Sequence, residues 1–239
     1  MLQIEPHSVH LWRILITDLV SQEAYFTKLL NSEELARASR FRFPIHRQRF
    51  AIARGVLREI LSQYTGTPPQ EIIFSYGPRG KPYLQNDSLD LQFNVSHSED
   101  VAVYALTQKV EIGVDIQKIE EEYHDAVAKR FFSEQEYTEL CQLPESERST
   151  AFCRLWASKE AIIKAVGEGL YVPLGKFSVD LHAKSQQILL SHERHQGKFY
   201  LESFNAHPDY CSAFATQQNV KKRFYWQWVK MGFEEWKNI

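Results

Sequence analysis

The chain has 239 residues, of which 44% are hydrophobic and 13% aromatic, so it can bury a sizeable core in one or two domains. Its 28 Lys and Arg residues against 30 Asp and Glu residues give a net charge of -2, which argues against a protein-wide attraction to nucleic acid or membranes. The 3 cysteines lack CxxC spacing and no segment has the character of a membrane span, so we expect a cytoplasmic protein without a disulfide framework.

The first quarter of the chain combines a strand with helices that are rich in arginine. Alternating apolar residues predict a strand over residues 9–16, and a polar cap followed by acids predicts a helix start at residues 31–35. Apolar residues at helical spacing predict a long helix over residues 50–64. An uncompensated run of guanidinium groups suits bidentate binding of phosphate, although charge runs are more often solvated helix faces. Such a run, without any Asp or Glu, comprises Arg37, Arg40, Arg42, Arg47, Arg49, Arg54 and Arg58.

Polar residues then follow two short predicted strands. A strand is expected over residues 72–76, and the Gly- and Pro-rich turn after it holds Lys81 at a loop rim, without the spacing of a P-loop. Residues 91–95 and 101–106 predict a hairpin whose bend carries Ser96 and His97. A hydroxyl and an imidazole there could hold a phosphate oxygen; an ordinary capped turn is the alternative. Serine-hydrolase chemistry is disfavoured because no GxSxG elbow is present.

The next predicted strand carries an acid on its polar face. Residues 112–117 alternate, so Gly113, Asp115 and Gln117 share the face opposite the core. Because Asp is disfavoured in strands, we expect Asp115 to have a functional use; a strand-end Asp entering a turn is the alternative. Gly113 has no side chain on this face, which would let a ligand or ion approach the backbone.

An amphipathic helix is predicted for the segment WASKEAIIK, ended by Gly167 and Gly169. Trp156, Glu160 and Lys164 follow one another at intervals of four and therefore lie close to one face. A surface helix with an ordinary Glu-to-Lys pair, contributing about 0.2–0.5 kcal/mol, is the simplest interpretation of this segment alone.

The two halves of the chain also resemble each other. The segment around Phe50 is similar to the segment around Phe152, and the Phe-Asn pair at residues 93–94 recurs at 204–205. The order helix, strand, Phe-Asn, strand therefore occurs twice, which predicts two similar α+β lobes. The cleft between such lobes is the expected ligand site.

Together, these motifs resemble those of Sfp-type (surfactin-synthetase-activating) 4'-phosphopantetheinyl transferases of the W/KEA subgroup. In chain order the resemblance is carried by GKP at 80–82, FNVSHS at 93–98, GVDI at 113–116, AKRFFS at 128–133 and WASKEA at 156–161 followed by Lys164. It implies an α+β fold of two similar α/β lobes related by a pseudo-twofold axis, with the active site in the cleft between them. We assign residues 1–109 to the N-terminal lobe and 110–239 to the C-terminal lobe.

The resemblance implies a Mg²⁺-dependent transfer of the 4'-phosphopantetheine arm of coenzyme A to a serine of an apo carrier protein, with release of adenosine 3',5'-bisphosphate. It gives catalytic roles to Asp115, Glu160 and Lys164. Carboxylates that hold a hard cation suit attack on a diphosphate, so Asp115 and Glu160 are the implied metal ligands. Glu160 is also the implied general base toward the carrier serine. The alternative is a noncatalytic coenzyme A or nucleotide-binding protein of the same fold.

The resemblance also implies a shell of residues around coenzyme A and one departure from the family pattern. Many members carry an acid two residues after the strand Asp, where this chain has Gln117, a neutral oxygen ligand at best. The implied coenzyme A ligands are Lys81, Ser96, His97, Lys159, Lys164 and arginines of the basic run, with Arg54 first and Arg47 and Arg37 behind it.

The implied partner is an acidic, helical carrier protein of fatty acid, polyketide or peptide synthesis. A basic rim would steer it, and apolar residues such as Phe131 and Phe132 would hold it. We expect a monomer, because two lobes in one chain supply a whole cleft, and neither nucleic acid nor membrane as partner. The aromatic tail over residues 221–239 is expected to pack in the core.

Overall fold

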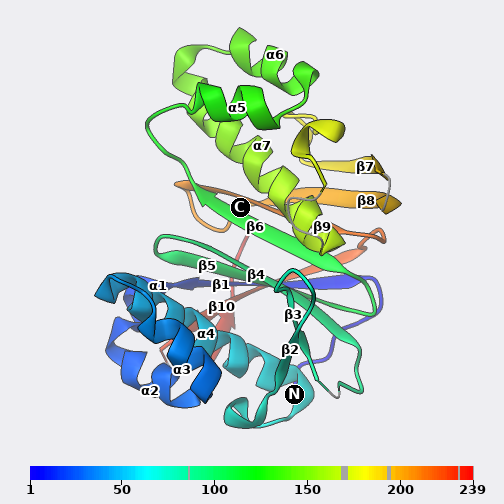
Figure 1. The fold of residues 1–239 in the computed structure, drawn as a ribbon. Coiled ribbons are helices and arrows are strands. Elements are labelled where there is room, and N and C mark those ends of the chain that lie inside the picture. Colours follow the sequence, from blue (N-terminus) through cyan, green and yellow to red (C-terminus); the bar gives the residue numbers. More distant parts are fainter. Residues whose placement is uncertain (86, 168–171, 193–194, 231, 239) are drawn as a thin grey trace.

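The computed structural model describes residues 1–85, 87–167, 172–192, 195–230 and 232–238. They form two stacked lobes in which the sheets face each other and the helices cover the outer sides (Figure 1). One apolar cluster lies between the sheets, and one cluster lies between each sheet and its helices. The expected α+β fold of two similar lobes is confirmed.

The N-terminal lobe contains the arginine-rich helices and a hairpin that meets the other lobe. Its elements are β1 (Ser8–Leu15), α1 (Ile16–Leu19), η1 (Val20–Gln22), α2 (Glu23–Leu29), α3 (Ser32–Ser39), α4 (Pro44–Thr65), η2 (Pro69–Glu71), β2 (Phe74–Tyr76), β3 (Pro82–Leu84), β4 (Leu91–Ser98) and β5 (Val101–Gln108). Helix α4 begins at Pro44, before the apolar pattern over residues 50–64 from which it was predicted. Proline is tolerated in the first turn of a helix because its missing N–H costs no hydrogen bond there.

The C-terminal part of the chain repeats this plan and then returns to the first sheet. Its elements are β6 (Ile112–Lys118), α5 (Asp125–Phe131), α6 (Glu134–Gln142), α7 (Glu145–Val166), η4 (Leu174–Lys176), β7 (Ser185–His192), β8 (His195–Phe204), β9 (Tyr210–Thr216), β10 (Lys222–Val229) and β11 (Gly232–Glu235). Gly167 ends α7 in the left-handed conformation, as expected, and Gly169 lies outside the described residues.

The repeat is visible in the strand order. Strands β1-β5-β4 in the first sheet and β6-β9-β8 in the second are both antiparallel runs, and α4 and α7, each 22 residues long, are the long helices of their lobes. Both lobes therefore use one supersecondary unit, which agrees with the recurrence of the Phe-Asn segments.

The final strands lie in the sheet of the N-terminal lobe. Strand β10 pairs in parallel with β1, and β11 pairs with β10, so the order is β11-β10-β1-β5-β4. Trp228 and Trp236 are buried there, as expected for the aromatic tail. The lobe division between residues 109 and 110 remains a proposal, and it separates β10 and β11 from the sheet to which they belong.

Two local expectations differ from the structure. Ser96 and His97 lie within β4, not at a bend, because the turn falls on Glu99 and Asp100, with Glu99 at a φ of 45°. Phe132 belongs to the core of the C-terminal lobe, so it offers no docking surface. In the described part of the chain, no helix combines the length and apolar character needed to cross a membrane.

Candidate active site

Strands β4 and β6, one from each lobe, run side by side without a shared backbone ladder. Side chains of β4 hold them together: the Asn94 Oδ1 atom accepts from Val114 N at 3.0 Å, and the Ser98 Oγ atom accepts from Lys118 N at 3.0 Å. Asn94 thus satisfies a backbone donor of β6 that would otherwise be left unpaired in the interior. These two hydrogen bonds bring Ser96, which lies between Asn94 and Ser98 in β4, against the polar face of β6.

Ser96, Asp115 and Lys164 meet at the junction of β4, β6 and α7. The Asp115 Oδ1 atom accepts from Ser96 Oγ at 2.7 Å and from Lys164 Nζ at 2.5 Å, and Lys164 Nζ also donates to Ser96 Oγ at 2.9 Å. Asp115 is buried, with 1% of its surface exposed, so its charge depends on these partners. Gln117 donates its Nε2 to the other carboxylate oxygen at 2.9 Å. Residues from both lobes are therefore joined around one carboxylate.

Gly113 explains how α7 comes so close to β6. A Cβ atom at this position would lie 2.0 Å from Ala161 O and 2.3 Å from Ala165 N, so only glycine allows this contact. The space expected beside Gly113 for a ligand or ion is thus filled by the backbone of α7. The close contact places Lys164 over Asp115.

Glu160 lies one helical turn before Lys164 but does not pair with it. In the part of the chain that the structure describes, the Glu160 carboxylate has no hydrogen bond or ion pair, whereas Lys164 is bound to Asp115. The pKa of Glu160 is raised, first by burial and then by the charge of Asp115, and Lys164 offsets part of this. The surface-pair interpretation is therefore wrong for Glu160 and Lys164.

This donor set fits a hard divalent cation. Glu160 is a partly buried carboxylate without an ion pair in the described part of the chain. Its pKa is raised first by burial and then by the charge of Asp115, and a cation between the two carboxylates would offset both effects. Among the described residues no group of three or more His, Cys, Asp or Glu side chains could hold a metal, so a cation here would have two carboxylates and the amide oxygen of Gln117. Mg²⁺ sites commonly use one or two carboxylates completed by substrate phosphates and water.

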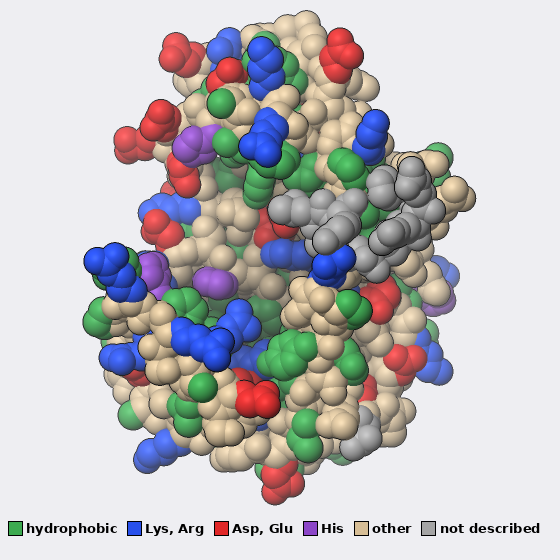
Figure 2. Space-filling view, in the orientation of Figure 1, with side chains coloured by type: hydrophobic (Ala, Val, Ile, Leu, Met, Phe, Trp, Pro, Cys, Tyr) green, Lys and Arg blue, Asp and Glu red, His purple; other side chains and the backbone are tan. Residues whose placement is uncertain are grey.

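Positive charge surrounds the outer side of this junction. The pKa of His97 is lowered, first because its ring is partly removed from water and then by the charge of Lys164. Arg49 and Arg37 lower the same pKa further. Figure 2 shows Lys and Arg side chains gathered across the waist of this face, between the helices of the two lobes. The cations around His97 make this a suitable place for an anion.

Arg49 is absent from the residues chosen from the sequence, although it belongs to the arginine run. Its guanidinium group binds Asp100 at 2.8 Å, at the turn that follows His97. No spacing in the sequence distinguishes it from its neighbours in the run. Only the packing of α4 against the β4–β5 turn brings it to this position.

The other arginines differ in their freedom to bind a ligand. Arg54, the first choice, forms an ion pair with buried Glu34, donates to Tyr76 Oη at 2.8 Å and lies 3.9 Å from the ring centre of Phe74. Arg37 and Arg47 are exposed, and Arg37 lies over the ring of Phe50 at 5.3 Å.

The two remaining lysines lie outside this cluster. Lys81 pairs with Glu111 at 2.6 Å and donates to Ile112 O at 3.1 Å, at the start of β6. Lys159 is fully buried in the C-terminal lobe, where it pairs with Glu136 at 2.8 Å and donates to the carbonyls of Leu174 and Phe177, each at 2.7 Å. The structure does not bring Lys159 together with Asp115 and Glu160.

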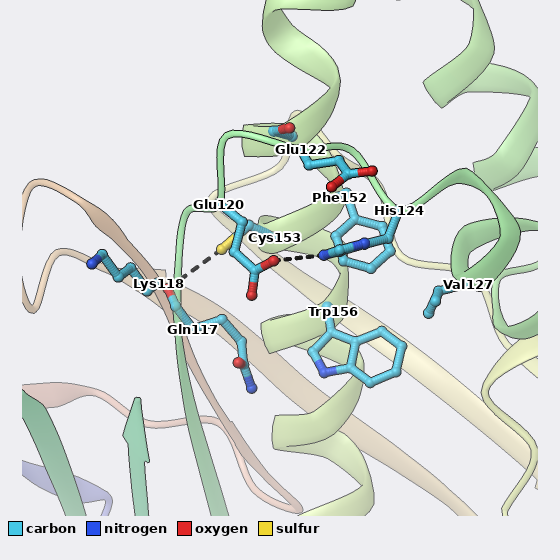
Figure 3. A pocket seen from close by; sticks show the side chains of 10 residues that line it. Gln117, Lys118, Glu120, Glu122, His124, Val127, Phe152, Cys153 and Trp156 are labelled. Atoms are coloured by element: carbon cyan, nitrogen blue, oxygen red, sulfur yellow. Dashed lines mark hydrogen bonds and ion pairs between the residues drawn. The ribbon is translucent and has the colours of Figure 1, made fainter. Parts of the chain in front are cut away.

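A pocket of about 210 Å³ adjoins the junction on the side of the C-terminal lobe. In Figure 3, the side chains of Gln117 from β6 and Trp156 from α7 lie opposite each other, and a Glu120–His124 pair at 2.6 Å also lines the pocket. Phe152 stacks on Trp156 at 5.8 Å and gives the pocket an aromatic wall. An organic group attached to an anion at the junction could extend into this pocket.

The chain is similar in sequence to known proteins over most of its length. Residues 111–216 match the model of the 4'-phosphopantetheinyl transferase superfamily, and residues 19–109 match that of the 4'-phosphopantetheinyl transferase N-terminal region. The chain is 42% identical over 165 residues to the 4'-phosphopantetheinyl transferase HetI of Nostoc sp., covering 68% of this chain and 70% of that protein. It is 37% identical over 166 residues to a putative 4'-phosphopantetheinyl transferase of Synechocystis sp., covering 69% and 68%. It is 31% identical over 188 residues to the 4'-phosphopantetheinyl transferase Sfp of Bacillus subtilis, covering 79% and 82%.

Proposed function

The chain belongs to the 4'-phosphopantetheinyl transferase superfamily, and we propose that it transfers the 4'-phosphopantetheine arm of coenzyme A to a serine of an apo carrier protein. The carrier is an acyl, polyketide or peptidyl carrier protein. One observation carries the proposal: Ser96 of one lobe and Asp115 and Lys164 of the other meet within hydrogen-bonding distance. The Glu160 carboxylate lies near them and has no ion pair among the described residues.

The transfer is a displacement at phosphorus. The carrier serine Oγ forms a bond to the phosphorus that bears the pantetheine, and the bond from that phosphorus to the bridging oxygen of the diphosphate breaks. Adenosine 3',5'-bisphosphate leaves with the electron pair, and the serine proton passes to the Glu160 carboxylate. Glu160 is the proposed base because its carboxylate lies near Asp115 and Lys164 and forms no ion pair in the described part of the chain.

Asp115, Glu160 and the amide oxygen of Gln117 would hold Mg²⁺. The ion supplies neutralisation of the charge that grows on the diphosphate oxygens. Lys164 would support the same charge through its ammonium group, which lies at this junction 2.5 Å from Asp115 Oδ1. When Lys164 turns from Asp115 to a phosphate oxygen, the lysine would still face a negative charge. Asp115 would then face the positive charge of Mg²⁺.

The remaining phosphate, on the ribose, fits the basic surroundings of His97. We assign the ribose 3'-phosphate to His97, with Arg37 among the cations near it. Ser96 and the exposed Arg47 remain proposed ligands of coenzyme A. Arg49 joins this shell because its charge reaches His97, although it too would first have to leave an acid, Asp100. Arg54 and Lys81 would first have to leave Glu34 and Glu111, so they are weaker candidates for coenzyme A ligands.

We further propose that the protein works as a cytoplasmic monomer. The three cysteines, Cys141, Cys153 and Cys211, are all free thiols, which suits a reducing compartment. Ser96 and Asp115 come from different lobes of one chain, so the proposed site needs no second subunit.

The test is to incubate the protein with coenzyme A, Mg²⁺ and several apo carrier proteins, and to weigh each carrier by mass spectrometry. We expect the mass of one phosphopantetheine to be added. Glu160→Gln and Asp115→Asn should each abolish the addition while the fold, followed by circular dichroism, is kept. Glu145→Gln at the start of the same helix is the matched control and should act as wild type. An unmodified set of carriers would instead favour a noncatalytic coenzyme A binding protein.

A further inference from the structure

An exposed apolar cluster lies at the start of α4 on the N-terminal lobe. Phe41, Phe43 and Ile45 are 38%, 53% and 46% exposed, and we call these three residues the Phe43 patch. Large apolar side chains that face water together, rather than singly, are typical of docking surfaces. The proposed reaction does not use this patch.

The patch is held in a fixed shape by its neighbours. The Phe41 ring packs on Phe50 at 5.6 Å, and the Phe43 ring meets His46 edge-on at 5.9 Å. Pro44 in the first turn of α4 restricts the backbone between Phe43 and Ile45. A prearranged apolar surface loses little side-chain entropy when a partner covers it.

Unpaired positive charge surrounds the patch. Arg40 and Arg42 are exposed and form no ion pair within the described part of the chain, and Arg42 lies over the ring of Phe43 at 5.4 Å. The sequence has no Asp or Glu between Arg37 and Arg58 that could neutralise them. The surface is therefore apolar at its centre and basic at its rim, in a protein of net charge -2.

A chain of contacts links the patch to the proposed phosphate site. Phe50 packs on Phe41 and also lies under the Arg37 guanidinium group at 5.3 Å. Arg37 in turn contributes to the lowered pKa of His97. A protein seated on the patch would therefore lie beside the basic wall of the cleft.

We propose that the Phe43 patch docks an acidic amphipathic helix of the carrier protein, an inference that rests on the proposed transferase function. The apolar face of such a helix covers the two phenylalanines and Ile45, and its carboxylates meet Arg40 and Arg42. This combination gives steering by charge and retention by apolar contact. A single-stranded nucleic acid is disfavoured, since the chain as a whole carries no basic excess and Ile45 offers no stacking surface.

The experiment measures steady-state transfer to one acidic apo carrier while carrier and coenzyme A are varied separately. The test variants are Phe43→Ser with Ile45→Ser, and Arg40→Glu with Arg42→Glu. Both should raise KM for the carrier about tenfold, which corresponds to about 1.4 kcal/mol, and leave kcat and KM for coenzyme A within twofold of wild type. The controls are Leu189→Ser, at a position 73% exposed on the other lobe, and Lys28→Glu on α2.

The outcomes separate this inference from the proposed function. If wild type transfers phosphopantetheine and both double variants keep its carrier KM, the docking inference is overturned while the transferase function stands. A wild type that modifies no carrier removes the basis of both. Binding of a single-stranded oligonucleotide, lost in both double variants while their carrier kinetics are unchanged, would assign the patch to nucleic acid and also overturn the inference. Increasing salt should raise the carrier KM of wild type more than that of the Arg40→Glu, Arg42→Glu variant.

Discussion

Glu136 caps the start of α6 and at the same time pairs with Lys159 in the middle of α7, with 2.8 Å between the two charged atoms. The N-terminal lobe contains the same device: Glu34 caps α3 and pairs with buried Arg58 of α4 at 2.8 Å. Each cation also donates to two carbonyls in the loop that follows its long helix. In each lobe, the capping acid and the buried cation together connect the short capped helix, the long helix and the loop that follows the long helix.

We expect Lys159→Met to lower the free energy of unfolding by about 3–5 kcal/mol, because it leaves the Glu136 charge buried without a counterion. The two carbonyls of the following loop also lose their donor. Urea unfolding followed by fluorescence measures this change. Lys176→Met, at an exposed position in η4, is the control and should stay within about 0.5 kcal/mol of wild type. A loss below about 1 kcal/mol in Lys159→Met would contradict the role given to the pair.

Much of the site was predictable because it depends on local patterns. Strict alternation over β6 placed Asp115 opposite the core, and the helical spacing of Glu160 and Lys164 placed them on one face, as observed. The resemblance to a known family then related these segments to one cleft. Strand β4 obeys the same alternation: Ser96 is buried and His97 exposed, which the expected bend had concealed.

Nonlocal packing accounts for the parts that the sequence did not predict. From the sequence, Lys159 could point to solvent or to the core. It points to the core because α6 supplies its partner, Glu136. The similar spacing of Glu34 and Arg58 in the first repeat, 24 residues (58−34) against 23 (159−136), was a usable signal for this pair. The return of β10 to the first sheet depends on parallel pairing with β1, about which local sequence carries no information.

Gly113→Ala should disturb both stability and the site. The new methyl group would meet Ala161 O at 2.0 Å, so α7 and β6 must separate, which costs roughly 3 kcal/mol or more. Separation also moves Lys164 away from Asp115, so transfer should fall even where the protein remains folded. Urea unfolding and the carrier mass assay measure the two effects. Gly77→Ala, whose nearest neighbour would be 3.7 Å away, should change neither.

Gln117→Glu tests the proposed cation site through stability as well as activity. The Gln117 amide nitrogen lies 2.9 Å from Asp115 Oδ2, so a carboxylate there adds repulsion when no cation is present. We expect the Tm to fall in a chelator and to recover at lower Mg²⁺ concentrations than wild type needs for its own increase, while transfer is retained. A Tm that does not respond to Mg²⁺ in either protein would refute the proposed ligands.

The raised pKa of Glu160 predicts a dependence of stability on pH. Burial and the nearby charge of Asp115 make the folded protein hold this proton more tightly than the unfolded chain does. Stability from Glu160 is therefore complete below the ordinary pKa of 4.5 and is lost as the pH rises through the raised folded-state pKa. The Gln side chain of Glu160→Gln has no proton to lose. As the pH rises above 4.5, the free energy of unfolding of wild type should therefore fall relative to that of the variant.

Urea unfolding of both proteins between pH 4 and pH 8, in the presence of a chelator, measures this difference. Glu145→Gln at the exposed start of α7 is the control, and its difference from wild type should not change with pH in the same direction. A constant difference between Glu160→Gln and wild type would show that the folded state does not raise this pKa. Mg²⁺ should cancel the trend in wild type, because a cation between Asp115 and Glu160 favours both ionised carboxylates.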